Sequence, residues 1–240
     1  MAELLVDVVS PELSELNFLI HQQFDRLIDV CIFLEKVIRK EAKQRRVHAQ
    51  RRRKQGQGEE ERAFNSVAID DYLFEIERDY PRLLRYALLV SMMSTVESCF
   101  VRLCRIADRL LTTVKFNEKA PCVIQRALAH LQDEAGLDTS RIRYYKDLAV
   151  GLQKLRNAVT HSGGCIKERN DKREIRAFAK SRTGVKIDKW RNIVLSSRFV
   201  SGNAHGMKNL FLQLHGKLKR QVYAKGQAGC SVLTLRKLEK

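Results

Sequence analysis

The residue types best suited to chemistry lie close together between residues 156 and 161, in the run R-N-A-V-T-H. Cleavage of RNA without a metal needs a group that takes the proton of a ribose 2′-hydroxyl. It also needs positive charge beside the phosphorus that gains a fifth oxygen. His161 fits the proton transfer, because a histidine side chain titrates near neutral pH. Arg156 fits the phosphate, since a guanidinium keeps its charge and binds two oxygens at once.

Two further residues are expected to support this pair. Asn157 would orient the histidine or the phosphate, and Glu97 would hold Arg156 in position. Five residues at about 100° each separate Arg156 and His161 by roughly 140° around an ideal helix. We therefore expect a turn or distortion at residues 160–161 to bring them together. A purely structural interpretation stays open, in which His161 caps the helix and Arg156 pairs with Glu97 to satisfy a buried charge.

Helices are expected to position these residues. Only three prolines and twelve glycines interrupt the 240 residues, which disfavours a turn-rich β sandwich. Apolar residues at three- and four-residue steps predict helices over 11–55, 67–113 with a kink or a new start at Pro81, 121–135, 138–161 ended by Gly163 and Gly164, and 202–223. Alternating apolar residues at 184–199 predict a small β-hairpin. No element is predicted for the charged stretch that ends at Arg182.

The predicted fold class is thus an all-α helical bundle with a small β-hairpin insertion before the last helix. Three parts are expected along the chain. Residues 1–60 form an N-terminal helix with a basic extension, and residues 61–225 form the helical domain. Residues 226–240 form a loose basic tail.

Charge predicts a polyanionic partner. The chain has 45 Lys and Arg against 28 Asp and Glu, a formal net charge of +17, and neutralising phosphates releases condensed counterions. Ten of these cations lie between Lys36 and Lys54, where residues 39–54 are interpreted as a helix projecting from the core and 55–60 as a flexible turn. The candidate RNA-binding residues are Arg45, Arg46, Arg51, Arg52, Arg53 and Lys154. A solvated helix end is the alternative, because no aromatic residues are interleaved with these cations.

Several classes of protein are disfavoured. The six cysteines are scattered without C-x-x-C or zinc spacing, and no P-loop, Rossmann fingerprint or G-x-S-x-G elbow occurs. No metal and no cofactor is therefore expected. The first twenty positions include four acidic residues, whereas a secretory signal would carry Lys or Arg near its start. No apolar run long enough to span a bilayer is expected. These features predict a cytoplasmic protein with reduced thiols and no membrane partner.

The 156–161 run resembles the R-x4-6-H motif of the HEPN superfamily, in its common R-N-x-x-x-H form. The run T-V-E-S-x-F-x-x-L within residues 91–104 is similar to the family's core helix that bears an acidic residue. The run A-L-A-H-L-Q-D-E-A-G-L, residues 127–137, is similar to the short helix before the motif helix. The likeness spans roughly residues 67–220 and leaves the basic N-terminal region outside its best part.

The resemblance implies a homodimer in which the motif helices of two protomers meet across a cleft. It implies a metal-independent endoribonuclease whose products carry a 2′,3′-cyclic phosphate and a 5′-hydroxyl. It further implies a toxin or antiviral-defence effector, sometimes with an antitoxin or a nucleotidyltransferase-like partner. Because some members of the family are noncatalytic, an RNA-binding or protein-interaction module using the same groove is the alternative. A DNA-binding regulator that uses the 39–54 arm is a third possibility, although no helix-turn-helix pattern supports it.

Overall fold

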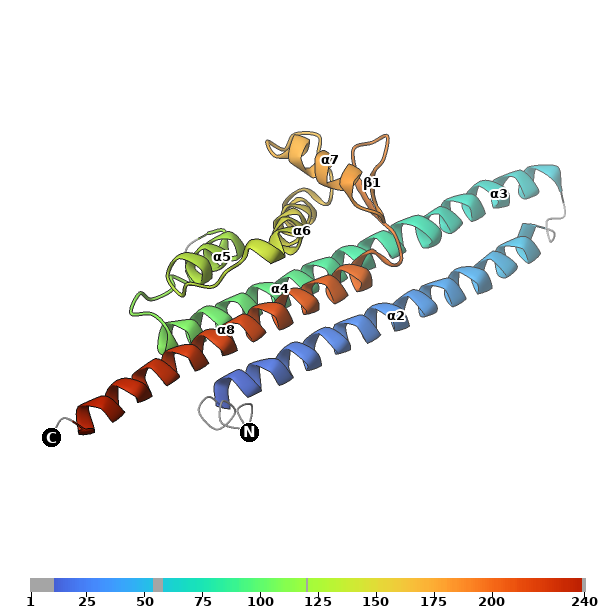
Figure 1. The fold of residues 1–240 in the computed structure, drawn as a ribbon. Coiled ribbons are helices and arrows are strands. Elements are labelled where there is room, and N and C mark those ends of the chain that lie inside the picture. Colours follow the sequence, from blue (N-terminus) through green and yellow to red (C-terminus); the bar gives the residue numbers. More distant parts are fainter. Residues whose placement is uncertain (1–10, 54–57, 120, 239–240) are drawn as a thin grey trace. The chain divides into compact units, whose positions relative to one another are not determined.

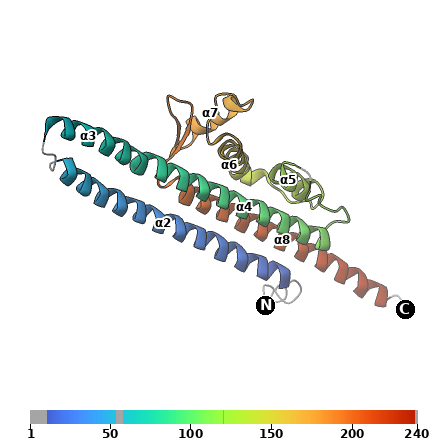
Figure 2. The ribbon, with the colours of Figure 1, turned by 180° about the vertical axis from the view of Figure 1, so that it is seen from behind.

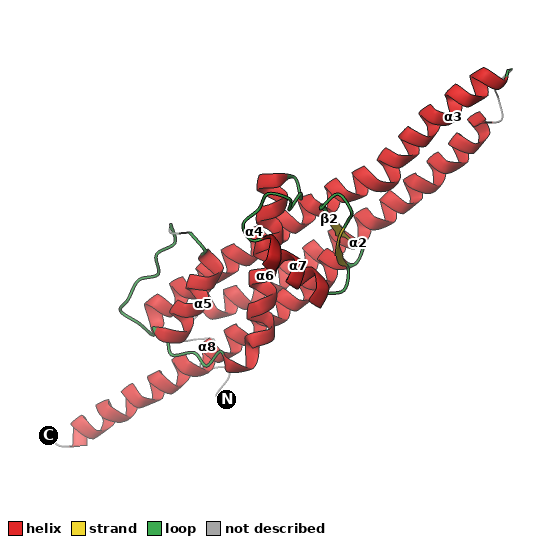
Figure 3. Cartoon of the chain, turned by 90° about the horizontal axis from the view of Figure 1, so that it is seen from above, coloured by secondary structure: helices red, strands yellow, loops and turns green. Residues whose placement is uncertain are grey.

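The computed structural model describes residues 11–53, 58–119 and 121–238 (Figure 1). Its elements are α2 (Pro11–Arg53), α3 (Glu59–Phe74), a π-helical turn (Glu75–Asp79), α4 (Tyr80–Leu110), α5 (Val123–Asp133), a 3-10 turn (Ser140–Ile142), α6 (Arg143–Ser162), α7 (Lys172–Ser181), β1 (Val185–Ile187), β2 (Ile193–Leu195) and α8 (Phe199–Leu238). Helices dominate, and a single two-stranded hairpin precedes the last helix in the described part of the chain (Figure 3). The predicted all-α class with a hairpin insertion is confirmed.

The helical run that contains Pro81 continues without a loop. A proline has no N–H for the carbonyl four residues earlier, and its ring crowds that carbonyl. The π-helical turn at Glu75–Asp79 lies just before Pro81 and shifts the bonding pattern there. A new α segment therefore begins at Tyr80, one of the two outcomes that the sequence predicts. The run also starts earlier than expected, at Glu59 rather than near residue 67.

The described residues fall into two compact units. The first, which we call the α8 unit, holds the described parts of Met1–Arg26, Met93–Lys154 and Asn203–Lys240. Its core is aromatic at the centre: the ring of Phe211 lies 5.7 Å from that of Phe24 and 4.8 Å from that of Phe100, centroid to centroid. All three side chains are fully buried, so the apolar faces of α2, α4 and α8 meet here as their periodicity requires.

The second unit, which we call the hairpin unit, consists of Leu27–Met92 and Leu155–Gly202. In it the C-terminal part of α2 and the whole of α3 run antiparallel and side by side (Figures 1 and 2). Arg85 of α4 joins α2 to the hairpin. Its Nε and Nη2 donate to the Glu35 carboxylate at 2.6 and 3.0 Å, and its Nη1 donates to the Leu195 carbonyl at 2.9 Å. This bidentate pair is largely buried, so its geometry holds the strands in a defined place.

The strands β1 and β2 pair in antiparallel register, with Lys186 opposite Val194. The preceding helix α7 was not predicted. Half of its ten residues, K-R-E-I-R-A-F-A-K-S, are charged, and only Ile175 and Ala179 are buried on it. Ile175, Phe178 and Ala179 follow helical spacing, but a span of five residues within a charged stretch is too short to identify a helix by periodicity.

The last helix is longer at both ends than predicted, since α8 runs from Phe199 to Leu238. The helix thus continues beyond residue 223, where the sequence predicts its end. No proline follows Pro121, and a glycine within a helix costs only about 1 kcal/mol relative to alanine. Nothing after residue 225 therefore terminates the helix.

One helical run, Ser66–Leu110, is long and apolar enough to meet the length and composition of a membrane span. Half of its most apolar window is buried inside the protein. The same values are typical of a core helix, so the run is weak evidence for a span. The sequence-based expectation that no such run exists is corrected, because serines and threonines interrupt the run without adding charge.

Candidate functional site

The end of α6 is held in place by two glycines and a tyrosine. Gly163 and Gly164 follow the last helical residue, with φ of +56° and +85°, conformations that favour glycine. The Gly164 N–H donates to the Ala158 carbonyl at 3.0 Å, and the Gly164 carbonyl accepts from the Ile193 N–H at 2.9 Å. A Cβ on Gly164 would lie 2.6 Å from Cζ of the Tyr86 ring. The motif helix therefore ends where predicted, tied to the hairpin.

Arg156 and His161 stay on different sides of this helix. The helix remains regular through Ser162, and the Thr160 hydroxyl donates to the Arg156 carbonyl at 3.0 Å. The distortion predicted at residues 160–161 is absent, so the two side chains keep the separation of about 140° that an α-helix imposes. Arg156 is half-buried, whereas His161 is exposed. A single protomer does not place both groups on one phosphate.

Asn157 shares a face of α6 with His161, because residues four apart lie about 40° from each other around the axis. Asn157 is half-buried. This side of the helix end therefore combines an amide and an imidazole. The position agrees with the orienting role that the sequence predicts for Asn157, which stays a prediction.

Arg169 is a further cation at this helix end that the sequence did not indicate. Its Nη1 lies 3.4 Å from the Asn157 carbonyl and 3.5 Å from the Ser162 hydroxyl oxygen. Its Nε and Nη2 each donate to the Asp171 carboxylate at 2.8 Å, and this bond raises the pKa of Arg169. The Arg169 guanidinium is therefore held at the end of α6, with the Asp171 carboxylate as its partner. No spacing rule relates residue 169 to the motif, since the loop between them sets the approach.

Glu97 and Lys154 belong to the α8 unit, whereas Arg156 belongs to the hairpin unit. Both Glu97 and Lys154 are half-buried. The predicted support of Arg156 by Glu97 and the predicted contact of Lys154 with RNA stay predictions.

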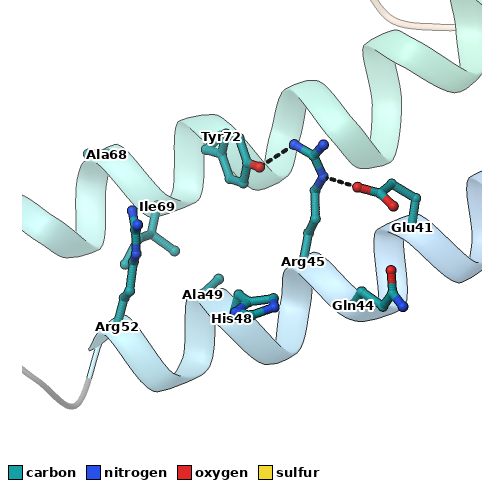
Figure 4. Close-up of a pocket in the computed structure, with 9 residues that line it drawn as sticks. All are labelled: Glu41, Gln44, Arg45, His48, Ala49, Arg52, Ala68, Ile69 and Tyr72. Atoms are coloured by element: carbon teal, nitrogen blue, oxygen red, sulfur yellow. Dashed lines mark hydrogen bonds and ion pairs between the residues drawn. The ribbon is translucent and has the colours of Figure 1, made fainter.

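The basic run of α2 lies against α3. Ala49 of α2 and Ile69 of α3 are both buried and line a cavity of about 840 Å³ between the two helices (Figure 4). Arg45 donates to Glu41 at 2.5 Å and to the Tyr72 hydroxyl. The apolar residues of α3, which begins before its predicted start, provide the surface that α2 covers.

The cations of this run are unequally available. Arg46 forms a bidentate pair with Glu77, and this hydrogen bonding lowers the pKa of the Glu77 carboxyl. Arg51 and Arg52 are exposed, and the Arg53 side chain lies outside what the structure describes. Two of the five candidate arginines on this helix thus already have carboxylate partners, which weakens the run as an RNA-binding surface.

Two of the buried cysteines are poor candidates for nucleophilic chemistry. Burial raises the pKa of Cys31 to about 11 and that of Cys99 to about 12, so both thiols stay protonated at neutral pH and are poor nucleophiles. Among the residues that the structure describes, no group of three or more His, Cys, Asp or Glu side chains could hold a metal ion.

No protein-family model, curated protein or solved structure matches this chain. The resemblance to the HEPN superfamily therefore rests on the motif residues and on their place at the end of α6.

Proposed function

We propose that the chain is a metal-independent endoribonuclease of the HEPN type that acts as a homodimer. The observation that carries the proposal is the exposed His161 on the last turn of α6, with Asn157 on the same face and the Arg169 guanidinium beside it. A proton-transfer group, an amide and a fixed cation at one solvent-accessible place suit phosphodiester chemistry.

In the proposed reaction, His161 and a second proton-transfer group or water move the protons. The ribose 2′-oxygen loses its proton and attacks the adjacent phosphorus. The bond from phosphorus to the 5′-oxygen breaks, and this oxygen takes a proton. The products are a 2′,3′-cyclic phosphate and a 5′-hydroxyl. Arginine charge stabilises the extra negative charge on the phosphorus oxygens in the transition state.

A second copy of the chain is needed because Arg156 and His161 diverge around α6. Two motif helices that face each other about a twofold axis would place Arg156 of one copy beside His161 of the other. The proposed site is therefore composite, and each dimer holds two such sites. As a wider proposal, the enzyme is a cytoplasmic toxin or antiviral-defence effector, paired with an antitoxin or a nucleotidyltransferase-like partner.

The same divergence also favours the second candidate, a noncatalytic RNA-binding or protein-interaction module. If the motif helices of two copies do not meet, neither copy has a complete site. Such a module would retain RNA affinity through its +17 net charge and would leave RNA intact.

Incubation of the purified protein with total RNA in EDTA, followed by mapping of the ends, separates the two candidates. We expect cleavage by the wild type with cyclic phosphate ends and its loss in His161→Ala. His205→Ala is the matched control, because His205 is an exposed histidine on another helix, α8. Cleavage that persists in His161→Ala would overturn the enzyme proposal, and intact RNA bound by a stable dimer would favour the module.

A further inference from the structure

A cationic groove lies between α7 and the β-hairpin, within the hairpin unit. Two adjoining cavities of about 650 and 480 Å³ share Lys189 and Arg191 in their linings. The larger is also lined by Arg176, Lys180 and Lys186, and the smaller by Lys167, Lys172 and Trp190. Together the two linings carry seven cations.

The positive charge of this groove is not neutralised by neighbouring residues. The one acidic residue in its lining, Asp188, is already engaged, since its Oδ1 accepts from the N–H of Trp190 at 2.9 Å and from that of Asn192 at 2.8 Å. Its Oδ2 lies 3.4 Å from Arg78. Within the described part of the chain, none of the seven cations forms an ion pair. Seven like charges on one concave surface repel one another, and an anionic ligand relieves that repulsion.

Trp190 adds an aromatic surface to the groove. It is the only tryptophan in the sequence, and 54% of it is exposed at the tip of the hairpin. The Arg78 guanidinium carbon lies 4.4 Å from its ring centroid and 4.7 Å from that of Phe74, so Arg78 steadies the indole from the protein side. The Lys189 ammonium, 4.3 Å from the same centroid, is on an exposed, flexible side chain that can move to a phosphate. An exposed indole among cations is the arrangement on which unpaired bases stack.

The backbone of the hairpin tip is held in a defined shape. Arg191 has φ of +71°, unusual for a residue with a side chain. Its N–H donates to the Asp188 carbonyl at 3.0 Å, and its carbonyl accepts from Ile166 N–H at 2.9 Å. Cys165 and Asn192 form an isolated bridge beside this bond. The groove is therefore tied by backbone hydrogen bonds to the segment that directly follows α6 and His161.

We propose that this groove binds single-stranded RNA, with phosphates on its Lys and Arg side chains and one unpaired base stacked on Trp190. A strand held there lies next to the segment that leads from His161, so the groove presents the substrate to the end of α6. This last step rests on the proposed function, whereas the binding itself does not. A duplex keeps its bases stacked inside the helix and offers none to the indole.

The test uses the full-length His161→Ala protein, in which the proposed cleavage is removed, and a short single-stranded RNA labelled for anisotropy. Because Trp190 is the only tryptophan, its fluorescence reports directly on stacking. We expect quenching that saturates with RNA. We expect Trp190→Ala to weaken binding about 5- to 100-fold, the effect of one lost stacked base, and Trp190→Phe to recover most of it.

Charge variants test the phosphate contacts. Lys189→Gln with Arg191→Gln should weaken binding and lower the salt slope by about 1.4, at about 0.7 per phosphate contact. The matched control is Arg26→Gln with Lys119→Gln, which removes the same charge at two exposed positions of the α8 unit. A larger effect of this control pair, an unchanged Trp190 fluorescence at saturating RNA, or equal binding of a blunt RNA duplex would overturn the proposal that the groove binds single-stranded RNA.

The two proposals fail separately. If the groove variants bind RNA as the parent does while wild-type protein cleaves RNA in EDTA, RNA binding in the groove is refuted and the ribonuclease activity is supported. If the groove variants lose binding while wild-type protein leaves RNA intact, RNA binding in the groove is supported and the ribonuclease activity is refuted.

Discussion

The hydroxyl of Tyr86 in α4 donates a hydrogen bond to the backbone carbonyl of Ile193 in β2. The same ring lies against Gly164, at the turn that ends α6. One buried side chain therefore fastens both the hairpin and the end of the motif helix to α4. Joint action of His161 and the hairpin would therefore depend on this anchor.

Removal of the anchoring hydroxyl should change stability and its pH dependence. Burial raises the pKa of Tyr86 to about 12 from its ordinary 10. Since the folded value is the higher one, the neutral phenol contributes stability that is complete below pH 10 and lost as pH rises through 12. Tyr86→Phe leaves the Ile193 carbonyl without this donor, so we expect a loss of about 1–2 kcal/mol near neutral pH. Urea unfolding of both proteins at several pH values measures this, and an equally steep alkaline decline in the variant would contradict it.

Two adjacent glycines should respond differently to alanine. In Gly163→Ala the added Cβ meets open space, so only the positive φ destabilises the folded protein, by about 1 kcal/mol. In Gly164→Ala the positive φ destabilises the folded protein in the same way, and the added Cβ also overlaps the Tyr86 ring. This overlap should cost a further 1–3 kcal/mol, roughly. Urea denaturation of the pair compares them directly. Equal losses would show that the Tyr86 ring does not hold the α6 end.

The Glu35–Arg85 pair should couple strongly. Glu35 is 7% exposed, so Arg85→Met leaves a carboxylate buried without its partner and should cost about 3–5 kcal/mol. Glu35→Met with Arg85→Met removes both charges and should be less damaging than either single change. A double-mutant cycle by urea unfolding measures the coupling, and additive losses would contradict it.

The sequence predicts those parts of the fold that depend on local signals. Three local signals are found in the structure: the Gly163-Gly164 stop, the hairpin, and the apolar face of the last helix at Met207, Leu210, Phe211, Leu214 and Leu218. Helix α7 was not predicted because its apolar residues, Ile175, Phe178 and Ala179, span only five positions within a charged stretch.

The same distinction between local and tertiary signals applies to the candidate site. The motif positions and the exposure of His161 follow from a helix that ends at a glycine turn. A loop places Arg169 at the end of α6, and the hairpin tip places Trp190 in the cationic groove; the shapes of the loop and the tip depend on Asp171 and Asp188. No periodicity in the sequence encodes contacts of this kind.

Arg169 should matter for cleavage if its charge acts at the phosphate. We expect Arg169→Ala to lower the cleavage rate about tenfold to a hundredfold, within the range found for groups that stabilise transition-state charge, without changing the oligomeric state. Arg173→Ala is the matched control, because Arg173 is an exposed arginine nearby on α7. Equal rates in the two variants, measured on one RNA substrate, would exclude this role.

Arg156 of one copy and His161 of the other are proposed to form one site, and subunit mixing tests this arrangement. Arg156→Ala and His161→Ala proteins should each be inactive, and their mixed dimer should regain one intact site of two. An equal mixture that exchanges freely should recover about a quarter of wild-type cleavage, since half of its dimers are mixed. A mixture that stays inactive while the wild type cleaves the same RNA would contradict the composite site.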